Sequence, residues 1–113
     1  MAVKRMKIPK VLTGKQVACI IEHSTLRWNN EDLRVGNTYC ALGMIARHAG
    51  VSPAVIDNEG TPEGTGIPQI NDGCKSRKEV IHTFGVEYKT REFRVGDWID
   101  RLLRKQKGEV TSA

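Results

Sequence analysis

The residue best placed for covalent chemistry is Cys40, in the segment NTYCALGMIARHAG. This segment predicts a helix whose first turn holds the thiol, and a helix N-terminus favours the nucleophilic thiolate. His48 follows eight residues later on the same helix, which separates the two along the axis by about 12 Å. His48 is therefore too far away to act as the base for Cys40.

A cysteine-dependent hydrolase or transferase would need partners from elsewhere in the chain, with His82 as the base and Asn71 or Asp72 to orient it. The alternative is that Cys40 is a small apolar side chain, because Met44 and the aliphatic residues around it describe a buried helix face. A cysteine in such surroundings is more often packed than reactive. The sequence therefore favours a protein without catalytic residues.

The remaining cysteines and histidines are too dispersed for a metal site. Cys19, Cys40 and Cys74 are far apart and form no C-x-x-C pair, so reduced thiols are expected. Cys19 and His23 are one helical turn apart and could supply two metal ligands, but no second local pair accompanies them. A packed thiol beside a helix-end histidine is the favoured interpretation, and we expect no metal and no cofactor.

The charge is uneven along the 113 residues, whose formal net charge is +5. Residues 1–15 hold five basic residues and no acid, residues 16–73 hold three basic and seven acidic ones, and residues 74–113 hold ten basic and six acidic ones. Terminal charge runs are usually solvated, but two basic ends that met in space could contact nucleic acid. The candidate contacts are Lys4, Arg5, Lys7, Lys10, Arg101, Arg104 and Lys105.

Local signals predict a mainly α single domain of four to five short helices joined by long Gly- and Pro-bearing loops, with a small β-hairpin (α+β) left open. Thr13, Ser52 and Ser76 are each placed to cap a helix, and Asn37 or Thr38 is expected to cap the one that contains Cys40. These helices are expected to end near His23, Asp57, Gly85 and Gly50, respectively, and Asp97 is expected to cap the last helix.

The segments between these helices are predicted to be loops, turns or short strands. Residues 26–39 predict a loop or short hairpin, IPQINDG an extended piece that runs into a turn, and residues 86–95 an irregular strand. Around the globular domain, expected at residues 11–106, we expect a basic flexible arm at residues 1–10 and a flexible tail at residues 107–113.

Several of these motifs, in this order, resemble a family of small phage and prophage proteins. The similar parts are the helix start Tyr39 to Ile45, the Asn71-Asp72 turn, the Ser76 to Ile81 helix beginning and the closing Trp98 to Leu103. That family shows a Cys-Cys-Leu-Gly helix start, and Tyr39 replaces its first cysteine here. The resemblance implies a phage accessory setting and no particular chemistry.

Together, these features predict a small non-enzymatic accessory protein that binds a host or phage macromolecule in the host cytoplasm. No apolar run is long enough to cross a bilayer, so no membrane partner is expected. A host or phage protein is the favoured partner. The alternatives are nucleic acid, bound by the basic termini, and a cysteine-dependent hydrolase or transferase centred on Cys40.

Overall fold

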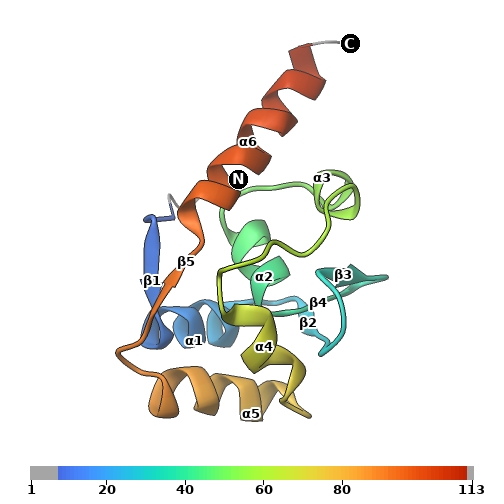
Figure 1. Ribbon diagram of the computed structural model, residues 1–113. Coiled ribbons are helices and arrows are strands. Elements are labelled where there is room, and N and C mark those ends of the chain that lie inside the picture. The colour runs from blue at the N-terminus through green and yellow to red at the C-terminus, as the bar shows by residue number, and fades with distance from the viewer. Residues whose placement is uncertain (1–7, 112–113) are drawn as a thin grey trace.

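The computed structural model describes residues 8–111, which form an α+β domain with a helical core and two small sheets (Figure 1). In chain order the elements are β1 (Val11–Thr13), α1 (Gly14–His23), β2 (Arg27–Trp28), β3 (Arg34–Val35), β4 (Thr38–Tyr39), α2 (Ala41–His48), α3 (Pro53–Asp57), α4 (Ile67–Asp72), α5 (Arg77–His82), the π-helical turn η1 (Thr83–Glu87), β5 (Glu92–Arg94) and α6 (Gly96–Thr111).

The first sheet joins the two ends of the domain. Strands β1 and β5 pair antiparallel, with Leu12 opposite the buried Phe93. Beyond the sheet, the carbonyl of Lys10 accepts hydrogen bonds from the amides of Val95 and Gly96. A side chain at Gly96 would lie 2.3 Å from Cα of Lys10, so only glycine allows this approach. The start of α6 is therefore fixed against the N-terminal segment.

The second sheet contains the small β-hairpin that the sequence suggested without deciding. Strand β4 pairs antiparallel with β3 and parallel with β2. Gly43 of α2 lies close to the backbone before β3, because a side chain there would lie 2.1 Å from the carbonyl oxygen of Leu33.

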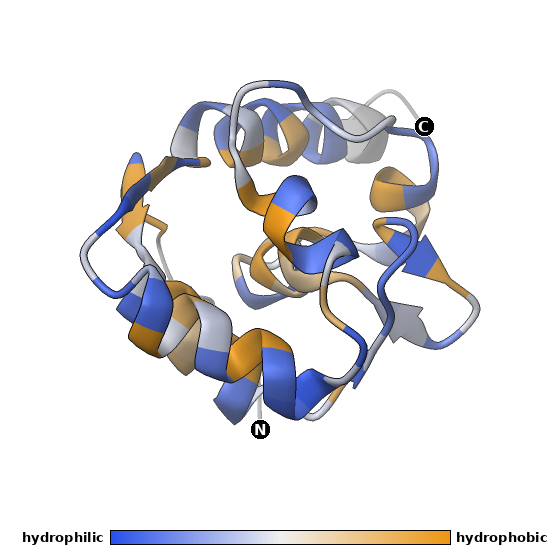
Figure 2. Cartoon of the chain, turned by 60° about the horizontal axis from the view of Figure 1, so that its bottom comes forward, coloured by the Kyte–Doolittle hydropathy of each residue, from blue (hydrophilic) through white to orange (hydrophobic). Residues whose placement is uncertain are grey.

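The core lies between α1, α2, η1 and α6. Helix α1 contacts α2 on one side and α5 and η1 on the other, and it buries Val17, Ala18 and Ile21. Phe84 of η1 and Phe93 of β5 meet edge to face, with their ring centroids 5.4 Å apart. Figure 2 shows the corresponding division into apolar inner faces and hydrophilic outer faces on the helices. This packing leaves one stripe of α1 open to solvent.

Three predicted helix caps are confirmed and two are wrong. The side chains of Thr13, Ser52 and Ser76 accept hydrogen bonds from the amides three residues later, which is N-cap geometry. The cap of α2 is Cys40, not Asn37 or Thr38, because Thr38 and Tyr39 belong to strand β4. Asp97 is also not a cap, because the last helix already begins at Gly96 and holds Asp97 in its first turn.

Two segments are more helical than the sequence predicted. The segment IPQIND forms helix α4, where Gly66 at φ 82° turns the chain and Pro68 fits the first turn. Gly85 does not end the helical segment that begins at Arg77, because the π-helical turn η1 follows α5 directly and continues through Gly85. A side chain at Gly85 would lie 3.1 Å from the Cβ of Ala18, so the glycine lets α1 pack closely there.

The helical structure extends further toward the C-terminus than the sequence predicted. Helix α6 continues to Thr111, past residue 106, where the globular domain was expected to end. Residues 1–7, which make up most of the predicted basic arm, lie outside the described residues.

Arg77 closes the C-terminal end of α1. Its guanidinium donates to the carbonyls of Ile21 and Ser24 at the end of the helix and to the carbonyl of Leu26 beyond it. Arg77→Lys is expected to lower the free energy of unfolding by about 1.5 kcal/mol, because an ammonium cannot reproduce this planar fork. Urea unfolding checks this, and the exposed Lys78→Arg is the matched control, expected to change stability by less than about 0.5 kcal/mol.

Candidate functional site

Cys40 is buried and acts as the N-cap of helix α2. Its side chain is 5% exposed, and its Sγ accepts a hydrogen bond from the amide of Gly43 at 3.5 Å. Burial raises the pKa of the Cys40 thiol, and the hydrogen bonds from Gly43 and Leu42 offset only part of that shift. The thiol is therefore protonated near neutral pH and closed to bulk solvent, unlike the thiolate a nucleophile requires.

Asn71 lies beside Cys40 and has a structural role that the sequence did not indicate. It is fully buried on α4, and its Oδ1 accepts from Trp28 Nε1–H at 2.7 Å and from the amide of Ala41 at 2.9 Å. Its Nδ2 donates to the carbonyl of Asn29 at 3.2 Å. The Asn71 amide thus joins α4, β2 and the start of α2, and both lone pairs of its oxygen are in use.

The structure does not bring His82 into this cluster. Asp72 is exposed on α4, and His82 is exposed on α5, where it lines a hollow against α1. Within residues 8–111 no hydrogen bond joins His82 to the thiol of Cys40 or to the side chain of Asn71. Of the four residues considered for a cysteine site, the fold thus joins only Cys40 and Asn71, through the first turn of α2.

Burial of the Cys40 thiol is expected to make the stability of the protein depend on pH in the alkaline range. Since burial raises the pKa of Cys40 in the folded chain, the unfolded chain loses this proton first as the pH rises. Stability is therefore fully present below the usual thiol pKa and falls as the pH rises toward the raised one. Cys40→Ser removes this contribution, so its unfolding midpoint should fall less steeply above about pH 9 than that of the wild type. Thermal unfolding across that range checks the slope.

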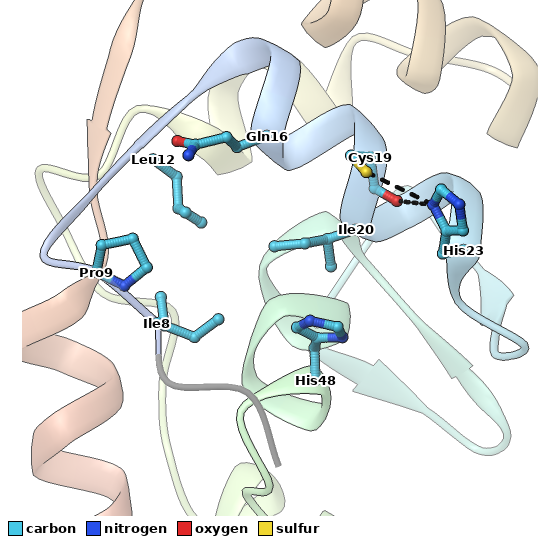
Figure 3. Close-up of a pocket in the computed structure, with 8 residues that line it drawn as sticks. All are labelled: Ile8, Pro9, Leu12, Gln16, Cys19, Ile20, His23 and His48. Atoms are coloured by element: carbon cyan, nitrogen blue, oxygen red, sulfur yellow. Dashed lines mark hydrogen bonds between the residues drawn. The ribbon is translucent and has the colours of Figure 1, made fainter. Parts of the chain in front are cut away.

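Two hollows flank the exposed stripe of α1. The first, which we call the apolar hollow, has a volume of about 370 Å³ and lies between α1, the N-terminal segment and the end of α2 (Figure 3). Most of its surface comes from apolar side chains of the N-terminal segment and α1. Its lining residues are Ile8, Pro9, Leu12, Gln16, Cys19, Ile20, His23 and His48.

The second hollow, which we call the basic hollow, lies between α1, α5 and η1 and has a volume of about 460 Å³. Its floor is aliphatic, and its rim carries two lysines, two histidines and one glutamate. Its lining residues are Lys15, Ala18, Cys19, Glu22, His23, Lys78, Ile81, His82, Gly85 and Val86.

Cys19 and His23 stand on the ridge between the two hollows and line both of them. The expectation of a packed thiol is wrong, because Cys19 is exposed on the open stripe of α1. His23 Nδ1 lies 2.9 Å from the carbonyl oxygen of Cys19 and 3.5 Å from its Sγ (Figure 3). Since a carbonyl oxygen only accepts, Nδ1 must carry the proton in this hydrogen bond.

With the proton on Nδ1, that ring nitrogen directs no lone pair toward the thiol of Cys19. Within residues 8–111, no group of three His, Cys, Asp or Glu side chains is placed to hold a metal ion.

The basic ends come together in part. Lys10 lies beside the first turn of α6 and pairs with Asp97 at 3.2 Å, while Lys105 pairs with Glu59 at 2.9 Å. Arg101 and Arg104 are exposed on the same helix. The other three candidate contacts, Lys4, Arg5 and Lys7, lie outside the described residues.

Comparisons with known proteins found no match: no family model, no curated protein and no solved structure is similar to this chain at a significant level. No helix among residues 8–111 is long and apolar enough to span a membrane.

Proposed function

We propose that this chain is a non-enzymatic phage accessory protein that binds a host or phage polypeptide, and that the open face of α1 is its binding surface. The observation that carries the proposal is the apolar hollow, where Ile8, Leu12 and Ile20 leave a cavity of about 370 Å³ at the surface. Concave apolar surface with a few polar groups at its rim is typical of binding sites.

The position of Cys40 supports the non-enzymatic part of the proposal. A nucleophile must reach its substrate, whereas this thiol is buried and serves as a helix cap. His82, which was suggested as its base, lines the basic hollow between α1, α5 and η1. The cysteine-dependent hydrolase or transferase is therefore the less supported alternative.

The test is recovery of a binding partner from host lysate, with the nucleic acid digested in a parallel sample. Ile20→Gln places an amide in the apolar hollow, and Val35→Gln makes the same kind of change at an exposed site on β3. The wild type and Val35→Gln should retain the same polypeptide, and Ile20→Gln should lose it. Equal recovery by both variants would place the partner elsewhere on the protein.

Nucleic-acid binding is a second candidate, favoured by the contact between the N-terminal segment and the start of α6. That contact brings Lys10 to the helix that carries Arg101 and Arg104. Ion pairs with Asp97 and Glu59 reduce the charge that Lys10 and Lys105 offer to phosphate. Fluorescence anisotropy with duplex and single-stranded DNA tests this candidate. Absence of binding at low salt, or equal binding by Arg101→Gln/Arg104→Gln, would remove it.

A further inference from the structure

We propose that the partner of this face is an acidic amphipathic polypeptide segment, which places apolar side chains in the two hollows beside α1 and carboxylates near Lys15 and Lys78. This inference rests on the proposed function, because it specifies the chemistry of the polypeptide that the face binds. Two properties of the face carry it: aliphatic surface on both sides of α1, and positive charge that the described chain leaves unpaired.

Aliphatic side chains lie in both hollows, one on each side of α1. Ile20 lies in the apolar hollow, while Ile81 and Val86 lie in the basic hollow, where Val86 is 62% exposed. The ridge between the hollows is the stripe of α1 from Lys15 to His23, about 12 Å long. An amphipathic helix, with apolar side chains repeating at one-turn intervals, can place anchors over a surface of that length.

The charge of the face is complementary to carboxylates. Lys15 and Lys78 are exposed and form no ion pair within residues 8–111, whereas Lys10 and Lys105 do. The imidazoles of the two hollows add hydrogen-bond donors, and Glu22 is the one carboxylate that lines either hollow. Groups of this kind steer acidic segments toward the surface and discriminate against basic ones.

The aliphatic surface favours a polypeptide over a nucleic acid as the partner. Phosphate backbones use the positive charge but have no apolar side chains to occupy the hollows, and a nucleic-acid site usually adds exposed aromatic rings for stacking. No Phe, Tyr or Trp lines either hollow. An acidic amphipathic segment uses both properties of the face.

The experiment measures fluorescence anisotropy of a labelled synthetic amphipathic helix made of leucine and glutamate, with the full chain as the binding protein. One comparison peptide replaces each glutamate with lysine, and another replaces each leucine with serine. Lys15→Glu/Lys78→Glu reverses two charges on the face. Arg101→Glu/Arg104→Glu, which makes the same change in net charge on α6, is the matched control.

The leucine and glutamate peptide should bind the wild type and the α6 variant equally, and Lys15→Glu/Lys78→Glu should bind it about tenfold more weakly. Both comparison peptides should bind more weakly than the original. Equal losses in the two charge-reversed variants, no binding of the peptide at all, or tighter binding of single-stranded DNA that depends on Lys15 and Lys78 would overturn the inference.

One result separates this inference from the proposed function. If the lysine peptide binds as tightly as the glutamate peptide, and Ile20→Gln weakens both, the face binds polypeptides but does not select acidic ones. The inference would then be wrong while the proposed function stands. If Ile20→Gln weakens neither peptide, the apolar hollow is not the binding surface and the proposed function also fails.

Discussion

Asn71→Leu is expected to lower the free energy of unfolding by about 3 kcal/mol, although the two side chains are similar in size. The asparagine amide satisfies Trp28 Nε1–H, the Ala41 amide and the carbonyl of Asn29. Leucine satisfies none of these groups, and each buried polar group without a partner costs about 1 kcal/mol or more. The start of α2 would lose its attachment to α4. This attachment also holds Cys40 in its position as the cap.

Denaturant unfolding followed by tryptophan fluorescence measures this effect. Asp72→Asn on the same helix is the control, because Asp72 is exposed, and its change in stability should be below about 0.5 kcal/mol. An unchanged unfolding midpoint for Asn71→Leu would show that the three hydrogen bonds of Asn71 contribute little to the fold.

The second large effect concerns the three thiols. Cys19 is exposed, whereas Cys40 and Cys74 are buried and burial raises the pKa of each. An aromatic disulfide reagent near neutral pH should therefore modify Cys19 at least about a hundredfold faster than the other two, which need local opening of the structure before they react.

Two controls show which thiol gives the fast reaction. Cys19→Ser should abolish it, and denaturant should make all three thiols of the wild type react together. Fast reaction at Cys40 in the folded protein would contradict its role as a buried cap and would favour the cysteine-dependent enzyme over the non-enzymatic protein.

Signals contained in a few neighbouring residues predicted much of the fold. Thr13, Ser52-Pro53 and Ser76 each specify a helix start through a hydrogen bond that spans three residues, so a short window contains the necessary information. The apolar pattern of α6, with Trp98, Ile99 and Leu102 buried, is likewise local.

Features that depend on distant residues were not predictable in the same way. The turn expected at Asn71-Asp72 is the end of a helix, and Asn71 is fixed by Trp28 and Ala41, which lie 43 and 30 residues away in the chain. Gly85 carries a helix-ending signal, but close packing of Ala18 against it accompanies a continuing helix. In both places tertiary contacts outweigh the local preference.

The candidate site was predictable only in part. The spacing of Cys19 and His23 showed that they share a face of α1, but not that this face is open, because α5, η1 and the N-terminal segment decide what covers the helix. The two hollows bring together Ile8, Ile20 and His48 on one side, and Lys15 and His82 on the other. No sequence pattern links residues at those separations.

The most direct test of the account compares the partner binding of Ile20→Gln with that of Cys40→Ser. The central claim is that the open face of α1 makes the functional contact and that the thiol of Cys40 only supports the fold. Partner recovery should therefore be lost in Ile20→Gln and unchanged in Cys40→Ser, with both variants folded by circular dichroism. Unchanged recovery in Ile20→Gln together with lost recovery in a folded Cys40→Ser would contradict the claim.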